Sequence, residues 1–79
     1  MPNEPIFADL CREQREQRYE TIATMAQLIG VSWRTWYRWE QGENLPRRTE
    51  AKRFAQRCKL PLAIVIAAVE QQRSEKRLS

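Results

Sequence analysis

The sequence contains no histidine, and Asp9 is its only aspartate. Histidine is the side chain most often used for general acid–base catalysis, and the chain also lacks a paired acidic site and a phosphate-binding glycine loop. Its two cysteines, Cys11 and Cys58, are far apart and form no C-x-x-C motif, so we expect buried thiols rather than a zinc site. These absences argue against an enzyme and against a metal or other cofactor.

Long hydrophobic runs are also missing. The longest, residues 60–69, has ten residues and includes Pro61, which is about half of what a bilayer crossing needs. The first five residues lack the basic and apolar regions of a signal peptide. With 79 residues, 42% of them hydrophobic, the chain can form one small core. We therefore expect a single cytoplasmic domain.

The positive charge is concentrated in the middle of the chain. The formal net charge of +4 is made up of −2 over residues 1–29, +5 over residues 30–60 and +1 over residues 61–79. Clustered basic residues attract phosphate polyanions, but the same pattern also fits a solvated basic surface. Charge alone leaves both interpretations open.

Hydrophobic residues recur with a helical period in five segments, and no segment reads as a convincing strand. We expect an all-α domain with helices near residues 6–18, 22–29, 33–41, 47–59 and 62–76, and a polar, frayed tail over 72–79. Thr21, Ser32 and Thr49 are candidate N-caps, because their hydroxyls can accept from free amides of the first turn. Gly30 and Gly42 follow the second and third helices, where glycine ends a helix at little cost.

The turn at Gly30 joins two short helices that differ in character. Helices connected so closely must cross steeply, as in a helix-turn-helix. The third helix has an aromatic face containing Trp36 and Trp39 and another face carrying two arginines. We expect the two tryptophans to pack in the core. Arg15 is expected to pair with an acid such as Glu40, which would tie the first helix to the third.

The order of these features resembles the XRE or Cro/C1-type helix-turn-helix domain of phage repressors and bacterial regulators. The matching positions, within residues 6–70, are Ala26, Gly30, Val31, Ser32, Glu40, Gly42 and Pro46. The resemblance implies a compact five-helix, lambda-repressor-like fold that binds double-stranded DNA. The tryptophan-rich third helix is also similar to that of small regulators carried by phages and mobile elements.

Several positions depart from the family pattern. Glu20 stands where a leucine commonly precedes the capping threonine. Ile22 stands where a glutamine often reaches DNA, and it cannot make that polar contact. Trp36 and Trp39 replace smaller aliphatic residues, so the core around them must be arranged differently.

The resemblance places the third helix in the major groove, with its outward side chains at the base edges. The candidate base-contacting residues are Trp33, Arg34, Tyr37 and Arg38. Arg34 and Arg38 are one turn apart, and a guanidinium group matches the O6 and N7 acceptors of guanine, so we expect G·C pairs in the site. For Trp33 a packing role is equally compatible with the sequence.

Phosphate contacts are expected from the segments that flank the third helix, including the amide groups at the start of the second. The candidate backbone-contacting residues are Thr21, Ile22, Thr24, Gln27, Thr35, Arg47, Arg48 and Lys52. Arg53 is a further candidate. The basic residues among these fit a solvated surface as well.

Domains of this kind usually act as twofold dimers on inverted half-sites. In the last helix, one stripe is expected to complete the core: Leu62, Val65, Ile66 and Val69. A second face is the candidate homodimer interface: Ile64, Ala67, Ala68 and Gln71. The alternative for this second face is a broad buried surface in a monomer.

Two functions follow from these expectations. The leading one is a sequence-specific transcription regulator, most simply a repressor that covers a promoter as a homodimer, with no small-molecule substrate. The alternative is a protein-binding, antitoxin-like or adaptor module in which Trp33 and Tyr37 anchor a partner.

Overall fold

The computed structural model describes the backbone of residues 5–78 and the side chains of residues 5–75. Its helices are α1 (Phe7–Gln17), α2 (Ile22–Ile29), α3 (Trp33–Glu40), α4 (Arg48–Cys58) and α5 (Leu62–Leu78). No strand occurs within residues 5–78. The predicted all-α, five-helix fold is confirmed. No helix in this range has the length and apolar character needed to span a membrane.

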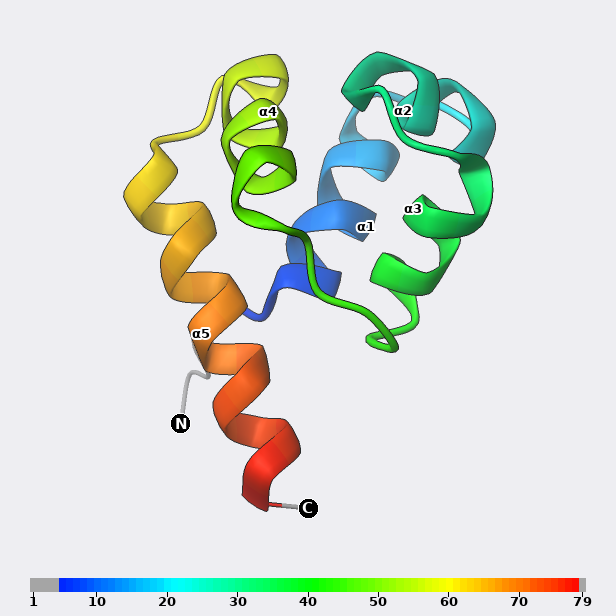
Figure 1. The fold of residues 1–79 in the computed structure, drawn as a ribbon. Helices are drawn as coiled ribbons and strands as arrows, with labels where there is room; N and C mark the ends of the chain where they lie inside the picture. The colour runs from blue at the N-terminus through cyan, green and yellow to red at the C-terminus, as the bar shows by residue number, and fades with distance from the viewer. Residues whose placement is uncertain (1–4, 79) are drawn as a thin grey trace.

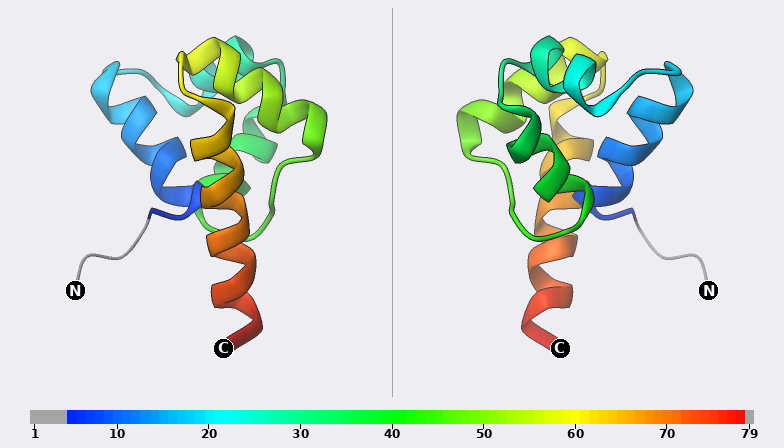
Figure 2. Two further views of the ribbon diagram at one scale, coloured as in Figure 1. Left: turned by 90° about the vertical axis from the view of Figure 1, so that its left-hand side faces the viewer. Right: turned by 90° about the vertical axis from the view of Figure 1, so that its right-hand side faces the viewer.

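The helices form two groups connected by α1. In Figure 1, α4 and α5 lie on the left, α2 and α3 lie on the right, and α1 lies behind and between them. α1 contacts both α3 and α5, while α4 contacts both α2 and α5. Figure 2 shows that α5 extends beyond the other helices, and its right-hand view presents α2 and α3 to the viewer. The α2–α3 pair therefore forms one side of the molecule.

Aromatic rings from three helices fill the centre of the core. The ring centroid of Phe7 lies 5.3 Å from that of Trp39 and 5.0 Å from that of Phe54. Trp36 stacks on Phe54 at 5.9 Å. All four side chains are buried. The predicted inward orientation of Trp36 and Trp39 is confirmed, and rings of this size explain how an eight-residue helix is held in place.

The two cysteines are buried, as predicted. Burial raises the pKa of the Cys11 thiol well above its ordinary value and raises that of Cys58 as well. Both thiols therefore stay protonated at neutral pH and act as small apolar side chains of the core.

α4 begins two residues earlier than it would if Thr49 were its N-cap. Arg47 is the N-cap, and its backbone amide donates to the Glu50 carboxylate at 2.8 Å. Thr49 therefore lies inside the first turn, and its prediction as the cap is wrong. A glutamate at the third helical position can satisfy the cap amide by itself, and its negative charge interacts favourably with the positive end of the helix dipole.

α5 is longer than predicted, because it continues to Leu78 through the segment expected to fray. Gln72 explains this difference at the start of that segment. Its side chain is buried, and its carbonyl oxygen accepts a hydrogen bond of 2.9 Å from the backbone amide of Ala8. The polar tail is thus tied to α1 at this residue. Ser79 lies outside the described residues.

The buried face of α5 is broader than the predicted stripe and is rotated relative to it. Val65 and Val69 are buried, as expected, but Leu62 is exposed and Ala68 is only 2% exposed. The reason is that α5 packs against α1 as well as against α4. Ala68 therefore belongs to the core, which corrects its placement on the exposed face with Ile64.

The turn between α2 and α3 requires glycine at position 30. Gly30 has φ +88°, and an added Cβ would lie 2.8 Å from Nη1 of Arg53, which donates to the Ile29 and Gly30 carbonyls at 3.2 Å. We expect Gly30→Ala to lower the free energy of unfolding by about 2 kcal/mol, combining left-handed strain with disturbance of Arg53. Urea denaturation followed by circular dichroism measures the change.

Gly42→Ala is the matched control, since Gly42 has φ +76° and an added Cβ would meet no atom within 4 Å. It should cost about 1 kcal/mol from backbone strain alone. Equal losses in the two variants would contradict a role for Arg53 at the turn.

Candidate nucleic-acid interface

Local hydrogen bonds define where α2 begins and ends and where α3 begins. The hydroxyl oxygens of Thr21 and Ser32 accept from the amides of Thr24 and Thr35, each at 3.1 Å. The amide of Gly30 donates to the Ala26 carbonyl at 2.8 Å and ends α2. The predicted caps and the glycine turn are confirmed, so short-range chemistry sets the start and the end of α2 and the start of α3.

Arginines of α4 complete the carboxyl end of α2, and the sequence interpretation missed this role. Arg53 donates to the carbonyls of Ile29 and Gly30, and Arg57 donates to that of Leu28, all at 3.2 Å. Arg53 was expected as a possible DNA contact. A signal was present, because the two arginines are four residues apart on one helix face and α2 has no basic residue in its own last turn.

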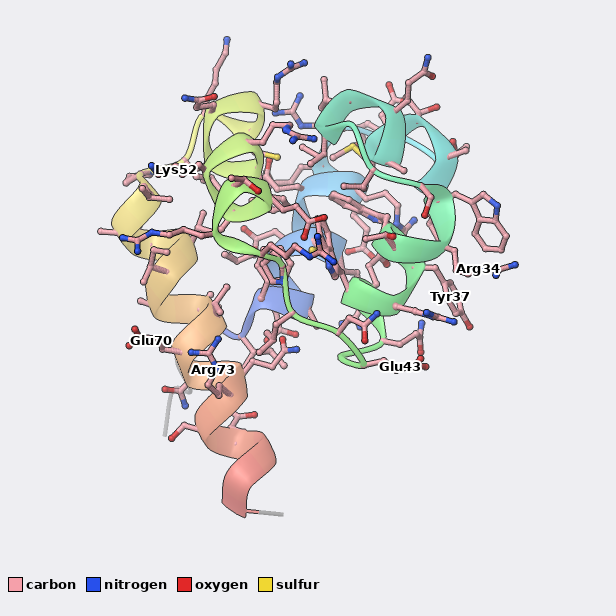
Figure 3. All side chains as sticks on the ribbon, viewed as in Figure 1. Arg34, Tyr37, Glu43, Lys52, Glu70 and Arg73 are labelled. Carbon is pink, nitrogen blue, oxygen red and sulfur yellow. The ribbon has the colours of Figure 1, made fainter. Side chains whose placement is uncertain are left out.

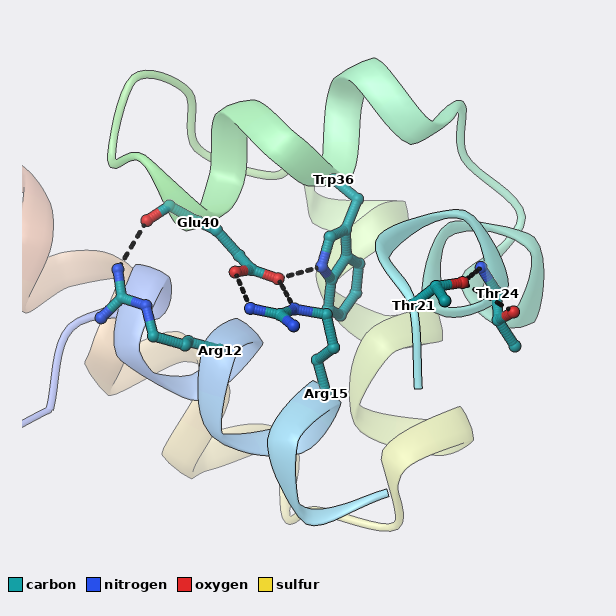
Figure 4. A network of polar contacts seen from close by, with 6 residues as sticks. All are labelled: Arg12, Arg15, Thr21, Thr24, Trp36 and Glu40. Atoms are coloured by element: carbon teal, nitrogen blue, oxygen red, sulfur yellow. Dashed lines mark hydrogen bonds and ion pairs between the residues drawn. The ribbon is translucent and has the colours of Figure 1, made fainter. Parts of the chain in front are cut away.

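A buried carboxylate joins α3 to α1. Figure 4 shows Glu40 accepting from Arg15 at 2.7 and 3.0 Å and from the Trp36 indole at 2.6 Å. Arg12 adds a hydrogen bond of 3.0 Å to the Glu40 backbone carbonyl. The predicted pairing of Arg15 with Glu40 is confirmed. Because both carboxylate oxygens are used, the helix is held in rotation as well as in position.

The pKa of Glu40 reflects a balance of opposing effects. Burial by itself would raise its pKa, but the hydrogen bonds from Arg15 and Trp36 and the charges of Arg15 and Arg12 outweigh burial and lower it. The same carboxylate raises the pKa of Arg15, chiefly through their hydrogen bond. Glu40 is therefore ionised in the folded protein at neutral pH.

The opposite face of α3 is open to solvent. Trp33 and Tyr37 remain 57% and 42% exposed, and their ring centroids are 6.4 Å apart in an edge-to-face arrangement. Arg34 and Arg38 are exposed too, and the Arg34 guanidinium lies 6.0 Å from the centre of the Trp33 ring. Figure 3 shows Arg34 and Tyr37 pointing outward from the α3 side of the molecule. The structure thus brings all four candidate base-contacting residues onto one helix face.

Most of the candidate backbone-contacting residues of α2 and α3 lie in the caps or first turns of these helices, while Gln27 lies in the second half of α2. Thr21, Thr24 and Gln27 are exposed, while the side chain of Ile22 packs against the core, so only its backbone is available to a ligand. Thr35 is half-buried and shares a hydrogen bond of 2.9 Å with the Ser32 hydroxyl. The first turn of α2 has amides without intrahelical acceptors and carries no acidic residue. These amides can bind an anion, and Glu20, the exposed residue just before the cap, places one negative charge beside that position.

The three basic candidates near the start of α4 have different surroundings. Arg47 is exposed at the end of the α3–α4 connection. Arg48 and Lys52 instead line a groove shared with α5. In Figure 3, Lys52 and Arg34 are on opposite sides of the molecule. A duplex lying along α3 would therefore be away from Lys52.

A family model described as a helix-turn-helix domain matches residues 6–65. The chain belongs to this helix-turn-helix family. The match extends from the start of α1 into α5 and includes the whole α2–α3 unit, so the resemblance to XRE-type regulators is confirmed. Searches of curated proteins and of solved structures give no match. Membership indicates a DNA-binding regulator.

Because of the Glu40 network, the stability of the helix-turn-helix domain should depend on pH in a defined way. Glu40→Gln should lower the free energy of unfolding at pH 7 by about 2–3 kcal/mol, because it leaves Arg15 without its charge partner. The folded-state pKa of Glu40 lies below the ordinary value of 4.5. Its stabilisation is therefore complete above that pH and is lost as the pH falls through the folded-state pKa. Urea denaturation of the parent and of Glu40→Gln, at pH values above and below 4.5, measures the difference between their free energies of unfolding.

Glu70→Gln is the control, since Glu70 is an exposed acid of α5 that takes no part in the Glu40 network. It should change stability by less than about 1 kcal/mol. A gap between parent and Glu40→Gln that stays constant below the ordinary glutamate pKa would refute the assigned role of the carboxylate.

Proposed function

We propose that this helix-turn-helix domain is a sequence-specific regulator of transcription that inserts α3 into the major groove of double-stranded DNA. The observation that carries the proposal is the division of α3 into two faces. Trp36, Trp39 and Glu40 are buried, while Arg34 and Arg38 are exposed one turn apart. A helix of about this diameter fits the major groove, and arginine is the side chain best suited to read guanine there.

The exposed aromatic residues support the same docking. Trp33 lies at the start of α3, the part of a recognition helix that comes closest to the bases. The Arg34 guanidinium is close to its ring, which restricts the conformations of a long side chain before binding. Tyr37 follows one turn later and can donate to a phosphate or pack on the groove wall. We propose that Trp33 contacts a thymine methyl group or a sugar.

Contacts to the DNA backbone come from both sides of α3. The amides at the first turn of α2 and the exposed hydroxyl of Thr24 can bind one phosphate, and Gln27 follows Thr24 by one turn of the same helix. Thr35, in the first turn of α3, is a further candidate for a backbone contact. Arg47 can bind the backbone on the other side. Arg48 and Lys52 are not included in the proposed surface, because they line the groove with α5.

The direct test is DNA binding by alanine variants, measured by fluorescence anisotropy with the regulator's own upstream DNA. We expect Arg34→Ala and Arg38→Ala each to weaken specific binding by about 10-fold to 100-fold, as loss of a base contact does, and to relax the preference for G·C pairs. Affinity should also fall steeply with salt concentration.

Lys52→Ala and Arg73→Ala are the controls for charge, since both remove an exposed cation on the α4–α5 side. Neither should change the affinity for DNA with a single half-site by more than about 2-fold at moderate salt. If Lys52→Ala were as damaging as Arg34→Ala, the duplex would have to lie along a different face.

The regulator is proposed to act as a homodimer through the exposed face of α5. Ile64 is 47% exposed, Ala67 is exposed beside it, and Gln71 is half-buried one turn later. Pro5, Ile64, Ala67 and Ala68 line a shallow, mostly apolar depression of about 300 Å³. A second copy would cover this apolar surface and double the number of DNA contacts. Half-sites about one helical turn apart, roughly 34 Å, would then be expected.

Replacing Ile64 tests the dimer surface. Ile64→Ser should weaken dimerisation on DNA, because it removes the largest exposed apolar side chain of this face, and it should leave the fold intact. Analytical ultracentrifugation with a two-half-site DNA measures the stoichiometry. Ala63→Ser, at an exposed neighbouring position, is the control. Two copies bound with unchanged cooperativity in Ile64→Ser would place the interface elsewhere.

Repression is the simplest regulatory outcome, because a small domain bound over a promoter blocks access to it. One observation favours a second role as an antitoxin-like or adaptor module: the paired exposed rings of Trp33 and Tyr37 have the form of a protein-binding anchor. The anisotropy experiment separates the two roles. Binding to upstream DNA that survives loss of both Arg34 and Arg38 would favour the adaptor.

A further inference from the structure

Two surface features are not used by the proposed DNA interface or by the Ile64 face. One is Tyr19, which is 96% exposed in the turn between α1 and α2. The other is the groove between α4 and α5, lined by apolar residues of α5 and by basic residues of both helices. The first feature projects from the domain and has acidic surroundings, whereas the second is concave and has basic edges, so the two are complementary in shape and in charge.

The Tyr19 turn is a rigid projection rather than a loose loop. Tyr19 has φ +54°, a left-handed conformation that is costly for a side chain other than glycine. Two backbone hydrogen bonds hold it there, from the Tyr19 amide to the Glu16 carbonyl and from the Glu20 amide to the Arg15 carbonyl, each at 3.1 Å. The Tyr19 side chain makes no hydrogen bond or ring contact within the described residues. The fold thus presents an aromatic ring to solvent at a backbone cost.

The surroundings of Tyr19 are acidic. Three exposed glutamates lie in the second half of α1 and in the turn: Glu13, Glu16 and Glu20. The basic residue of this segment that does not pair with Glu40 is Arg18, which is exposed as well. Arg15 belongs to the Glu40 ion pair and does not offset them. The aromatic tip therefore carries a local charge of −2 over these four side chains.

The α4–α5 groove has an apolar floor and a basic rim. Leu62, Ile66 and Val69 of α5 line it, and Leu62 is one of the few large exposed apolar side chains of the domain. Arg48, Lys52 and Arg73 lie at its edges with one acid, Glu70, for a local charge of +2. Figure 3 shows Lys52, Glu70 and Arg73 along this side of the molecule. Its volume is about 450 Å³, within the range of pockets that take drug-sized ligands, so one aromatic ring fits.

We propose that the Tyr19 turn of one copy docks into the α4–α5 groove of a second copy. The ring would cover Leu62 and Ile66, and the three glutamates would face Arg48, Lys52 and Arg73. A chain cannot fill its own groove, because the left-hand view of Figure 2 shows the turn between α1 and α2 at a corner of the domain, on the side away from the start of α4, where the groove lies. The proposed contact is head to tail, so a pair of copies retains one free projection and one free groove.

This arrangement predicts open-ended association rather than a closed dimer. It uses neither α3 nor the Ile64 face and is compatible with twofold pairing, but its Glu20 directly precedes the α2 cap Thr21, so it is tested without DNA. One aromatic anchor with a charged rim is a small interface, and contacts of this size are weak and sensitive to salt. Copies held close together, as on neighbouring half-sites, would be linked by it although free copies associate only at high concentration.

The test uses the full chain without DNA, in an Ile64→Ser background that removes the α5 face. Sedimentation velocity at about 1 mM protein and low salt should give an average mass above one chain that rises with concentration, and about 0.5 M salt should reverse it. Tyr19→Asn removes the ring and suits the left-handed backbone. Leu62→Ser combined with Arg73→Glu disables the groove. Each variant alone should sediment as one chain, whereas Ser74→Glu, an exposed control on α5, should behave as the parent.

Mixing the two disabled variants is the decisive step. One supplies an intact Tyr19 turn and the other an intact groove, so an equimolar mixture should form pairs and grow no further. Circular dichroism checks that every variant is folded. A parent that stays a single chain, a Tyr19→Asn variant that associates as the parent does, or a mixture without pairs would each overturn the proposal. Each of these contrary results would overturn the head-to-tail contact and leave the result of the DNA-binding test unchanged, because the sedimentation experiment contains no DNA.

Discussion

The orientation of α3 depends on one buried carboxylate. Glu40 accepts hydrogen bonds from Arg15 of α1 and from the indole of Trp36 in its own helix, and both of its oxygens are occupied. An isolated helix of eight residues would be unstable in water, so its geometry has to come from tertiary contacts. The Trp36 and Trp39 rings supply the apolar part of those contacts, while the carboxylate sets the rotation about the helix axis. Because that rotation is fixed, Arg34 and Arg38 point away from the core.

A second set of polar contacts fixes α2 in the same way. Arg53 and Arg57 bind the last carbonyls of α2 and of the turn, so α4 holds the end of α2 while α1 holds α3. The two helices of the unit are thus each attached to a different part of the scaffold. This division keeps the crossing angle rigid, and a rigid reading surface loses less conformational entropy on binding than a mobile one.

Features that depend on neighbouring residues were predictable from the sequence. The glycine at position 30, the caps Thr21 and Ser32 and the inward tryptophans all follow from spacing within one or two turns, and the structure confirms them. Contacts across the fold were harder to predict. The burial of Ala68 depends on α1 covering α5, and the left-handed Tyr19 depends on how the α1–α2 turn closes. Neither is visible in a periodic pattern, because both are set by elements distant in sequence or by backbone geometry.

The contacts of the basic residues show why the net charge of a segment overestimates the number of side chains that are available to a nucleic acid. Residues 30–60 hold eight lysines and arginines, and the fold uses them for different purposes. Arg53 and Arg57 bind backbone carbonyls, and Arg48 and Lys52 line the α4–α5 groove. Arg34 and Arg38 are the members that α3 presents to solvent beside exposed aromatic rings. The α3 face therefore depends on two guanidinium groups placed by a buried carboxylate, and the net charge of the segment adds only long-range attraction for phosphate groups.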